Sequence, residues 1–94
     1  MTVSFATRLT VPSDVLISII DDEAVLLNLK SERYFGLNRT GTTMWTALTT
    51  AESIESAYQT LVGTFAVDPE TFRHDMSNLV RELIEHDLVE GSPE

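Results

Sequence analysis

The stretch RYFGLNRTGTTMW, residues 33–45, constrains the fold of this chain more than any other. Residues 33–37 are predicted to form a β-strand, because aromatic and aliphatic side chains there suit a pleated, half-buried surface. Asn38 is a preferred helix N-cap, so it ends the strand and begins a helix. Trp45, the only tryptophan, falls on that helix where its ring can lie on the sheet. The stretch therefore predicts a strand, a corner and a helix in immediate succession.

Two more strands are predicted before this stretch, at 15–20 and 24–29. The first is rich in β-branched residues, and a polar turn at 21–23 separates it from the second. Strands joined this closely form an antiparallel meander, so the three-stranded sheet comprises 15–20, 24–29 and 33–37. The third strand is then expected at an edge of the sheet.

The predicted register between the last two strands follows from a three-residue loop at 30–32. Such a loop would place Leu27 opposite Phe35 and Val25 opposite Leu37. This pairing sets apolar side chains against one another on the buried face, with Leu26 and Asn28 on the other face.

Three helices are predicted to follow, at 39–50, 53–66 and 69–86. Asp68-Pro69-Glu70 is the strongest local signal, since it combines an N-cap, a proline at the first helical position and an acid in the first turn. Ser53 is the expected cap of the middle helix, and Gly63 is expected inside that helix, where it would allow close packing.

Three strands followed by three helices predict an α+β fold with the parts of a winged-helix module. The 94 residues, 43 % of them apolar, are expected to form a single domain, 1–94. Within it, 1–13 would be an N-terminal arm and 91–94 a flexible tail.

Composition excludes several classes of function. The chain has no cysteine, so thiolate metal sites and cysteine nucleophiles are absent, and a cytoplasmic location is expected. Its formal net charge of −9 disfavours nucleic acids and anionic membranes as partners. The longest apolar run, 15–20, is too short to span a bilayer.

No group of residues suggests catalysis, a metal or another cofactor. His74 and His86 lie on one predicted helix and would be roughly 18 Å apart along its axis, so they cannot share a metal ion. The carboxylates at 21–23 and at Asp68 and Glu70 are explained by a turn and a helix N-terminus. The sequence therefore predicts a binding protein and not an enzyme.

The edge strand is the candidate binding surface. An edge presents unpaired N–H and C=O groups to an arriving peptide, and residues 34–37 include no lysine or proline to block it. Gly36 would leave room for another backbone, and one flank of the last helix, with Val80 and Ile84, is expected to stay partly exposed. These features predict β-strand addition. The alternative is that Gly36 is a strand bend and that the apolar residues of the helix are all core.

Residues 25–29 (VLLNL) and 34–45 (YFGLNRTGTTMW) resemble the PqqD-like domains called RiPP recognition elements. The resemblance covers about residues 14–90 and includes the VDPE start of the last helix and the ending Leu83-Ile84-x-x-x-Leu88-Val89. The Leu-Asn-x-Thr-Gly corner followed by tryptophan is its most specific part. The short stand-alone form is most similar to the proteins encoded beside lasso-peptide leader peptidases.

The resemblance implies that the protein binds the leader segment of a ribosomally synthesised precursor peptide and presents it to a leader peptidase or another modifying enzyme. The leader would add as a strand to Arg33, Tyr34, Phe35, Gly36 and Leu37. The last helix would wall the cleft with Arg73, Met76, Val80, Leu83 and Ile84.

Two rival functions remain open from the sequence. One is a winged-helix DNA-binding protein, although the would-be recognition helix is acidic. The other is a subunit that binds a folded partner enzyme and has no need of the strand edge. The acidity of 69–86 also suggests a leader with basic residues.

Overall fold

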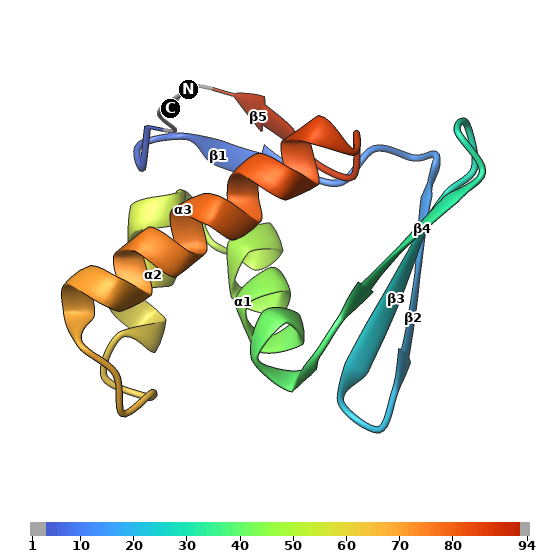
Figure 1. Cartoon of the computed structure of the whole chain (residues 1–94). Helices are drawn as coiled ribbons and strands as arrows, with labels where there is room; N and C mark the ends of the chain where they lie inside the picture. The colour runs from blue at the N-terminus through green and yellow to red at the C-terminus, as the bar shows by residue number, and fades with distance from the viewer. Residues whose placement is uncertain (1–3, 93–94) are drawn as a thin grey trace.

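Three helices lie on one side of an antiparallel sheet in the computed structural model, which describes residues 4–92 (Figure 1). The sheet has the order β2-β3-β4, so β4 lies at an edge. Its strands are β2 (Val15–Ile20), β3 (Glu23–Asn28) and β4 (Arg33–Leu37), and the helices are α1 (Arg39–Thr50), α2 (Ile54–Leu61) and α3 (Pro69–Glu85). The predicted α+β fold, with its three-stranded sheet and three helices, is confirmed.

A second, two-stranded sheet joins the two ends of the described chain. β1 (Arg8–Thr10) pairs antiparallel with β5 (Glu90–Ser92), and Leu9 lies opposite Gly91. The arm expected at 1–13 is thus partly a strand, and 91–92 belong to a strand rather than to a tail. Residues 1–3 and 93–94 lie outside the described residues.

Each helix begins at the cap that the sequence predicts. The side chain of Asn38 accepts a hydrogen bond from the Gly41 N–H, and that of Ser53 accepts one from the Ser56 N–H. The Asp68 carboxylate accepts two, from the N–H groups of Glu70 and Thr71. Local capping chemistry therefore fixes where all three helices start.

The predicted end of α2 is wrong. The helix stops at Leu61 and not at residue 66, and Gly63 lies in the turn that follows, where a Cβ would meet nothing within 4 Å. Phe65 folds back so that its ring lies 5.2 Å from the ring of Phe72 on α3. This contact stabilises the turn over a continued helix, which Gly63 would weaken.

The predicted register of β3 against β4 is also wrong, by one residue. Phe35 pairs with Leu26 rather than Leu27, and Leu37 pairs with Ala24 rather than Val25. The loop has four residues, 29–32, because Glu32 takes a left-handed backbone conformation (φ 60°) and donates its N–H to the Asn28 carbonyl. The extra residue turns the other face of β3 toward the helices.

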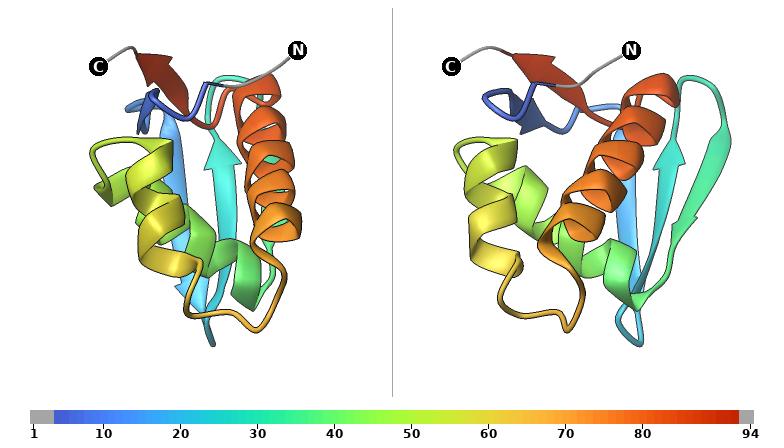
Figure 2. Two further views of the ribbon diagram at one scale, coloured as in Figure 1. Left: turned by 90° about the vertical axis from the view of Figure 1, so that its left-hand side faces the viewer. Right: turned by 60° about the vertical axis from the view of Figure 1, so that its left-hand side comes forward.

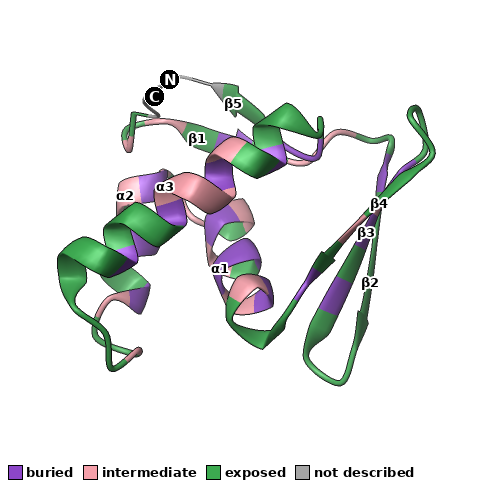
Figure 3. Ribbon diagram, viewed as in Figure 1, coloured by how far each residue is buried: buried purple, intermediate pink, exposed green. Residues whose placement is uncertain are grey.

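The buried residues lie mainly on the three helices and, in the sheet, mainly on β3 (Figure 3). β3 contributes Ala24, Leu26 and Asn28, all at most 4 % exposed, whereas the apolar residues of β2 beyond Val15 are exposed. The fully buried large side chains come from β1, β3, all three helices and the segment before β5: Leu9, Leu26, Leu48, Ile54, Phe72, Met76, Val80, Leu83 and Leu88.

Candidate functional site

The corner between β4 and α1 is built for close packing. A Cβ on Gly41 would lie 3.2 Å from Leu37 Cδ2 and 3.4 Å from Asn38 Oδ1. The buried Thr42 hydroxyl accepts a hydrogen bond from the Ala24 N–H and donates one to the Leu37 carbonyl. The end of β4 is therefore held to both α1 and β3.

The free edge of β4 can be assigned residue by residue. Leu29 donates its N–H to Asp14 beside β2, whereas the Asn28 carbonyl accepts from Glu32 beside β4. Backbone groups alternate in direction along an antiparallel strand. Even-numbered residues of β3, such as Leu26, therefore form hydrogen bonds to β4. The N–H and C=O groups of the β4 residues opposite them are used in these bonds.

Phe35 is the ladder partner of Leu26. By the same alternation, the N–H and C=O groups of Tyr34 and Gly36 point away from β3. No strand of residues 4–92 pairs with that side of β4. Tyr34 and Gly36 thus carry the open hydrogen-bonding groups of this edge.

One flank of α3 faces this edge. The His86 ring packs on the Phe35 ring with centroids 5.1 Å apart. Asp75, Leu79 and Glu82 precede His86 by 11, 7 and 4 residues, so helix geometry places them within about 40° of it around the axis. We call Asp75, Leu79, Glu82 and His86 the strand-side flank. It combines one apolar side chain, two carboxylates and one imidazole.

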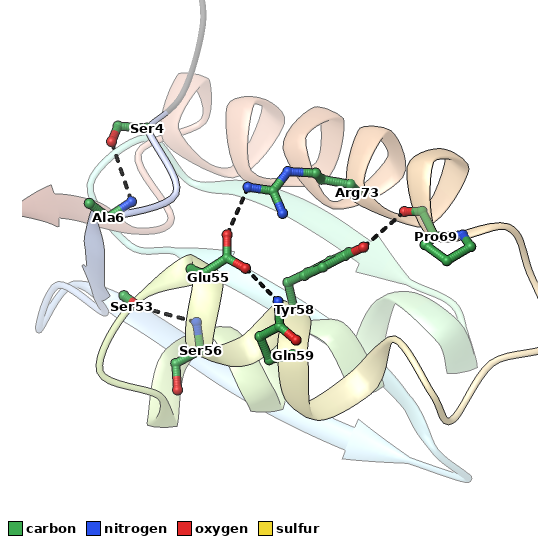
Figure 4. A network of polar contacts seen from close by, with 9 residues as sticks. All are labelled: Ser4, Ala6, Ser53, Glu55, Ser56, Tyr58, Gln59, Pro69 and Arg73. Carbon is green, nitrogen blue, oxygen red and sulfur yellow. Dashed lines mark hydrogen bonds and ion pairs between the residues drawn. The ribbon is translucent and has the colours of Figure 1, made fainter.

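Arg73 lies on a different side of α3. It is 13 residues from His86, which corresponds to about 140° around the helix. Its guanidinium lies 2.7 Å from Glu55 on α2 (Figure 4). It also stacks over the rings of Phe5, at 4.2 Å, and Tyr58, at 4.9 Å. Arg73 thus ties α3 to α2 and the N-terminal arm.

The Arg73–Glu55 pair shifts the titration of both groups. The hydrogen bond from Arg73 lowers the pKa of the Glu55 carboxyl, and the bond to Glu55 raises the pKa of the Arg73 guanidinium. Both side chains remain partly exposed, so solvent moderates the interaction. The contact holds the arm in place without closing off the β4 edge.

The other α3 residues that were predicted to wall the cleft differ in how far they are buried. Met76, Val80 and Leu83 are fully buried, so the expectation that Val80 stays partly exposed is wrong. Ile84 is 37 % exposed, and it lies within about 20° of Arg73 around the helix. Arg33, Tyr34, Phe35, Gly36 and Leu37 all lie in β4, where Leu37 is buried and Tyr34 is 72 % exposed.

Asn28 and the strand-side flank were missed from the sequence. Asn28 is buried and bonds through its side chain to four backbone groups. The sequence did carry a signal for Asn28, because asparagine is uncommon in β-strands and this one stands among apolar residues. The flank has no sequence signal of its own, because only the packing of α3 against β4 selects it.

Within residues 4–92 no set of three or more histidine, aspartate or glutamate side chains is placed to hold a metal ion. None of the described helices combines the length and apolar character needed to cross a bilayer.

Known proteins resemble this chain in sequence and in fold. The family model for Coenzyme PQQ synthesis protein D (PqqD) matches residues 23–89. No curated protein sequence matches the chain. Among solved structures, TbiB1 in complex with the TbiA(beta) leader peptide is 30 % identical, with a TM-score of 0.80 over 90 % of this chain and 99 % of that one.

A second solved structure, lasso peptide synthetase B1 complexed with the leader peptide, has a TM-score of 0.79. It covers 88 % of this chain and 98 % of the other. At 23 % identity it shows a shared fold alone.

Proposed function

Because this chain belongs to the PqqD family, we propose that it binds the leader segment of a ribosomally synthesised precursor peptide by strand addition to β4. It presents the bound leader to a processing enzyme, such as a leader peptidase or a cyclase, in lasso-peptide-type biosynthesis. Its role is binding and not catalysis, and it works in the cytoplasm, where the precursor is made.

The open edge of β4 beside α3 is the observation that carries this proposal. Tyr34 and Gly36 offer backbone donors and acceptors to an extended peptide, while Phe35 and the strand-side flank offer side-chain contacts. In strand addition, main-chain bonds give affinity and alternate side chains give specificity. The likeness to TbiB1, whose structure holds a leader peptide, supports the same reading.

Burial and position on α3 guide which residues we propose as contacts. Arg33, Tyr34, Phe35 and Gly36 would meet the leader directly, and the strand-side flank would form the wall. Met76, Val80, Leu83 and Leu37 are buried and would support the wall from within. Arg73 contacts Phe5 of the arm, and Ile84 lies on the same side of α3, so both would act indirectly.

Fluorescence polarisation with a labelled synthetic leader tests the proposal. Gly36→Pro removes one of the open N–H groups and should abolish binding. Ile19→Pro is the matched control: the same alternation turns the N–H of this exposed residue toward the free edge of β2. The control should leave binding intact, and circular dichroism should show both variants folded.

Equal loss in the two proline variants, or none in either, would contradict docking on β4. A labelled DNA duplex run beside the leader tests the rival function, and we expect no binding to it at a net charge of −9.

A further inference from the structure

Gly36 lies in the middle of β4, although nothing in the fold requires a glycine there. Its φ angle is not positive, and a Cβ at this position would meet nothing within 4 Å. Glycine in a strand weakens it, because the chain loses more entropy and no side chain packs. Most residues would therefore fit here and stabilise the free protein better.

Gly36 faces the outer side of the sheet, because its neighbour Phe35 lies opposite the buried Leu26 and successive residues of a strand face opposite sides. The helices lie on the other side of the sheet (Figure 2). Side chains opposite one another in a sheet share a face. Gly36 is opposite Val25, which is in turn opposite Ser18. This row is uncharged, and Val25 behind Gly36 is 42 % exposed.

The neighbouring row differs in one respect. In that row Tyr34 lies opposite Leu27, so β4 supplies a large side chain there. In the row of Gly36, β4 supplies none. A peptide strand beside β4 would meet the Tyr34 ring in that row. In the Gly36 row it would meet open space with Val25 beyond.

We propose that Gly36 is a specificity-determining position: it forms a notch through which one large apolar side chain of the bound leader reaches Val25. This inference rests on the proposed function. The leader residue paired with Gly36 projects to the outer face whichever way the leader runs. Strands lie about 4.8 Å apart, so Val25 is about 10 Å from the leader backbone, within contact of an aromatic or long aliphatic side chain that lies across the glycine.

The notch selects by size and polarity. A small leader residue would not span Gly36, and a charged one would find no partner in the row of Ser18, Val25 and Gly36. The leader therefore carries an aromatic or long aliphatic residue at the one position paired with Gly36. This contact lies on the opposite face of the sheet from α3, so it adds to the contacts made there.

The test is a mutant cycle read by fluorescence polarisation with the labelled leader. Val25→Thr keeps the shape of the side chain and removes its apolar character, and it should weaken leader binding about threefold to tenfold. Gly36→Val covers Val25, so adding Val25→Thr to that variant should change nothing further. Ile20→Thr is the control, because Ile20 is exposed at the opposite edge, and it should bind as the parent protein does.

An alanine scan of the leader should find one position whose substitution removes the effect of Val25→Thr. If the Val25→Thr variant binds the leader as tightly as the parent protein does, the notch proposal is wrong and the proposed function still stands. A folded parent protein that does not bind the leader would overturn both.

Discussion

The side-chain amide of Asn28 in β3 donates a hydrogen bond to the Asp87 carbonyl, 3.1 Å away, and so fixes the end of α3 beside the β3–β4 turn. The same amide group also donates to the His86 carbonyl at 3.3 Å. Its oxygen accepts from the N–H groups of Lys30 and Ser31 in the turn. One buried side chain thus sets both the turn length and the position of the helix beside β4.

Replacing Asn28 by alanine should lower the free energy of unfolding by about 1–3 kcal/mol, because four backbone groups in a partly buried site would lose a hydrogen-bond partner. Urea denaturation measures this. Asn78→Ala is the control, since within residues 4–92 the Asn78 side chain bonds to the Arg81 side chain alone, one turn further along α3. Equal losses in the two variants would show that the Asn28 bonds do not fix the turn.

Asp68→Ala should cost about 1 kcal/mol of stability by removing the cap of α3. Its carboxylate oxygen lies 3.1 Å from the Glu70 nitrogen and 3.2 Å from that of Thr71. Asp68→Asn keeps an acceptor at the cap and should stay close to the parent. A melting temperature unchanged by Asp68→Ala would mean that α3 does not depend on this cap.

Helix starts and strand positions could be predicted because they depend on neighbouring residues. Asn38, Ser53 and Asp68 each bond to backbone groups two or three residues away. Both partners of each such contact lie within a few residues of one another, so the local sequence is enough to predict it. The positions of β2, β3 and β4 likewise followed from local side-chain types.

The register and the strand-side flank could not be predicted, because distant contacts set them. Asn28 bonds to residues 58 and 59 positions away, and this need to bury its amide selects the four-residue turn. The flank depends on the contact of His86 with Phe35, and a helical pattern gives no preference between the two sides of α3. The pairing of β1 with β5 joins segments too short to show a periodic pattern.

Glu55 should make stability depend on pH. Its pKa is lowered in the folded protein by the hydrogen bond from Arg73. A group with a depressed folded pKa contributes stability above its unfolded pKa, and this is lost as pH falls through the folded value. The stability difference between the parent and Glu55→Gln should therefore be largest near neutral pH and shrink in acid.

Thermal unfolding at a series of pH values measures that difference. Glu52→Gln removes the same charge at an exposed site before α2, and its difference from the parent should vary less with pH. A Glu55→Gln difference that stays constant into acid would show that the ion pair contributes nothing.

The two carboxylates of the strand-side flank should make leader binding depend on salt. Asp75 and Glu82 lie on the side of α3 that faces β4, which favours a leader with basic residues. Surface charges are screened by salt, with a Debye length of about 10 Å at 0.1 M. Raising the salt concentration should therefore weaken binding of the labelled leader, and Glu82→Gln should reduce that dependence.

Glu85→Gln is the matched control for this prediction. It removes the same charge from a residue that lies about 100° from His86 around the helix, outside the strand-side flank. Glu85 is exposed on the solvent side of α3, so its loss should change the salt dependence less than the loss of Glu82. Binding that is indifferent to salt in the parent protein would mean that the flank contributes shape and not charge. In that case the apolar contacts of Phe35 and Leu79 would account for the recognition on this side of the strand.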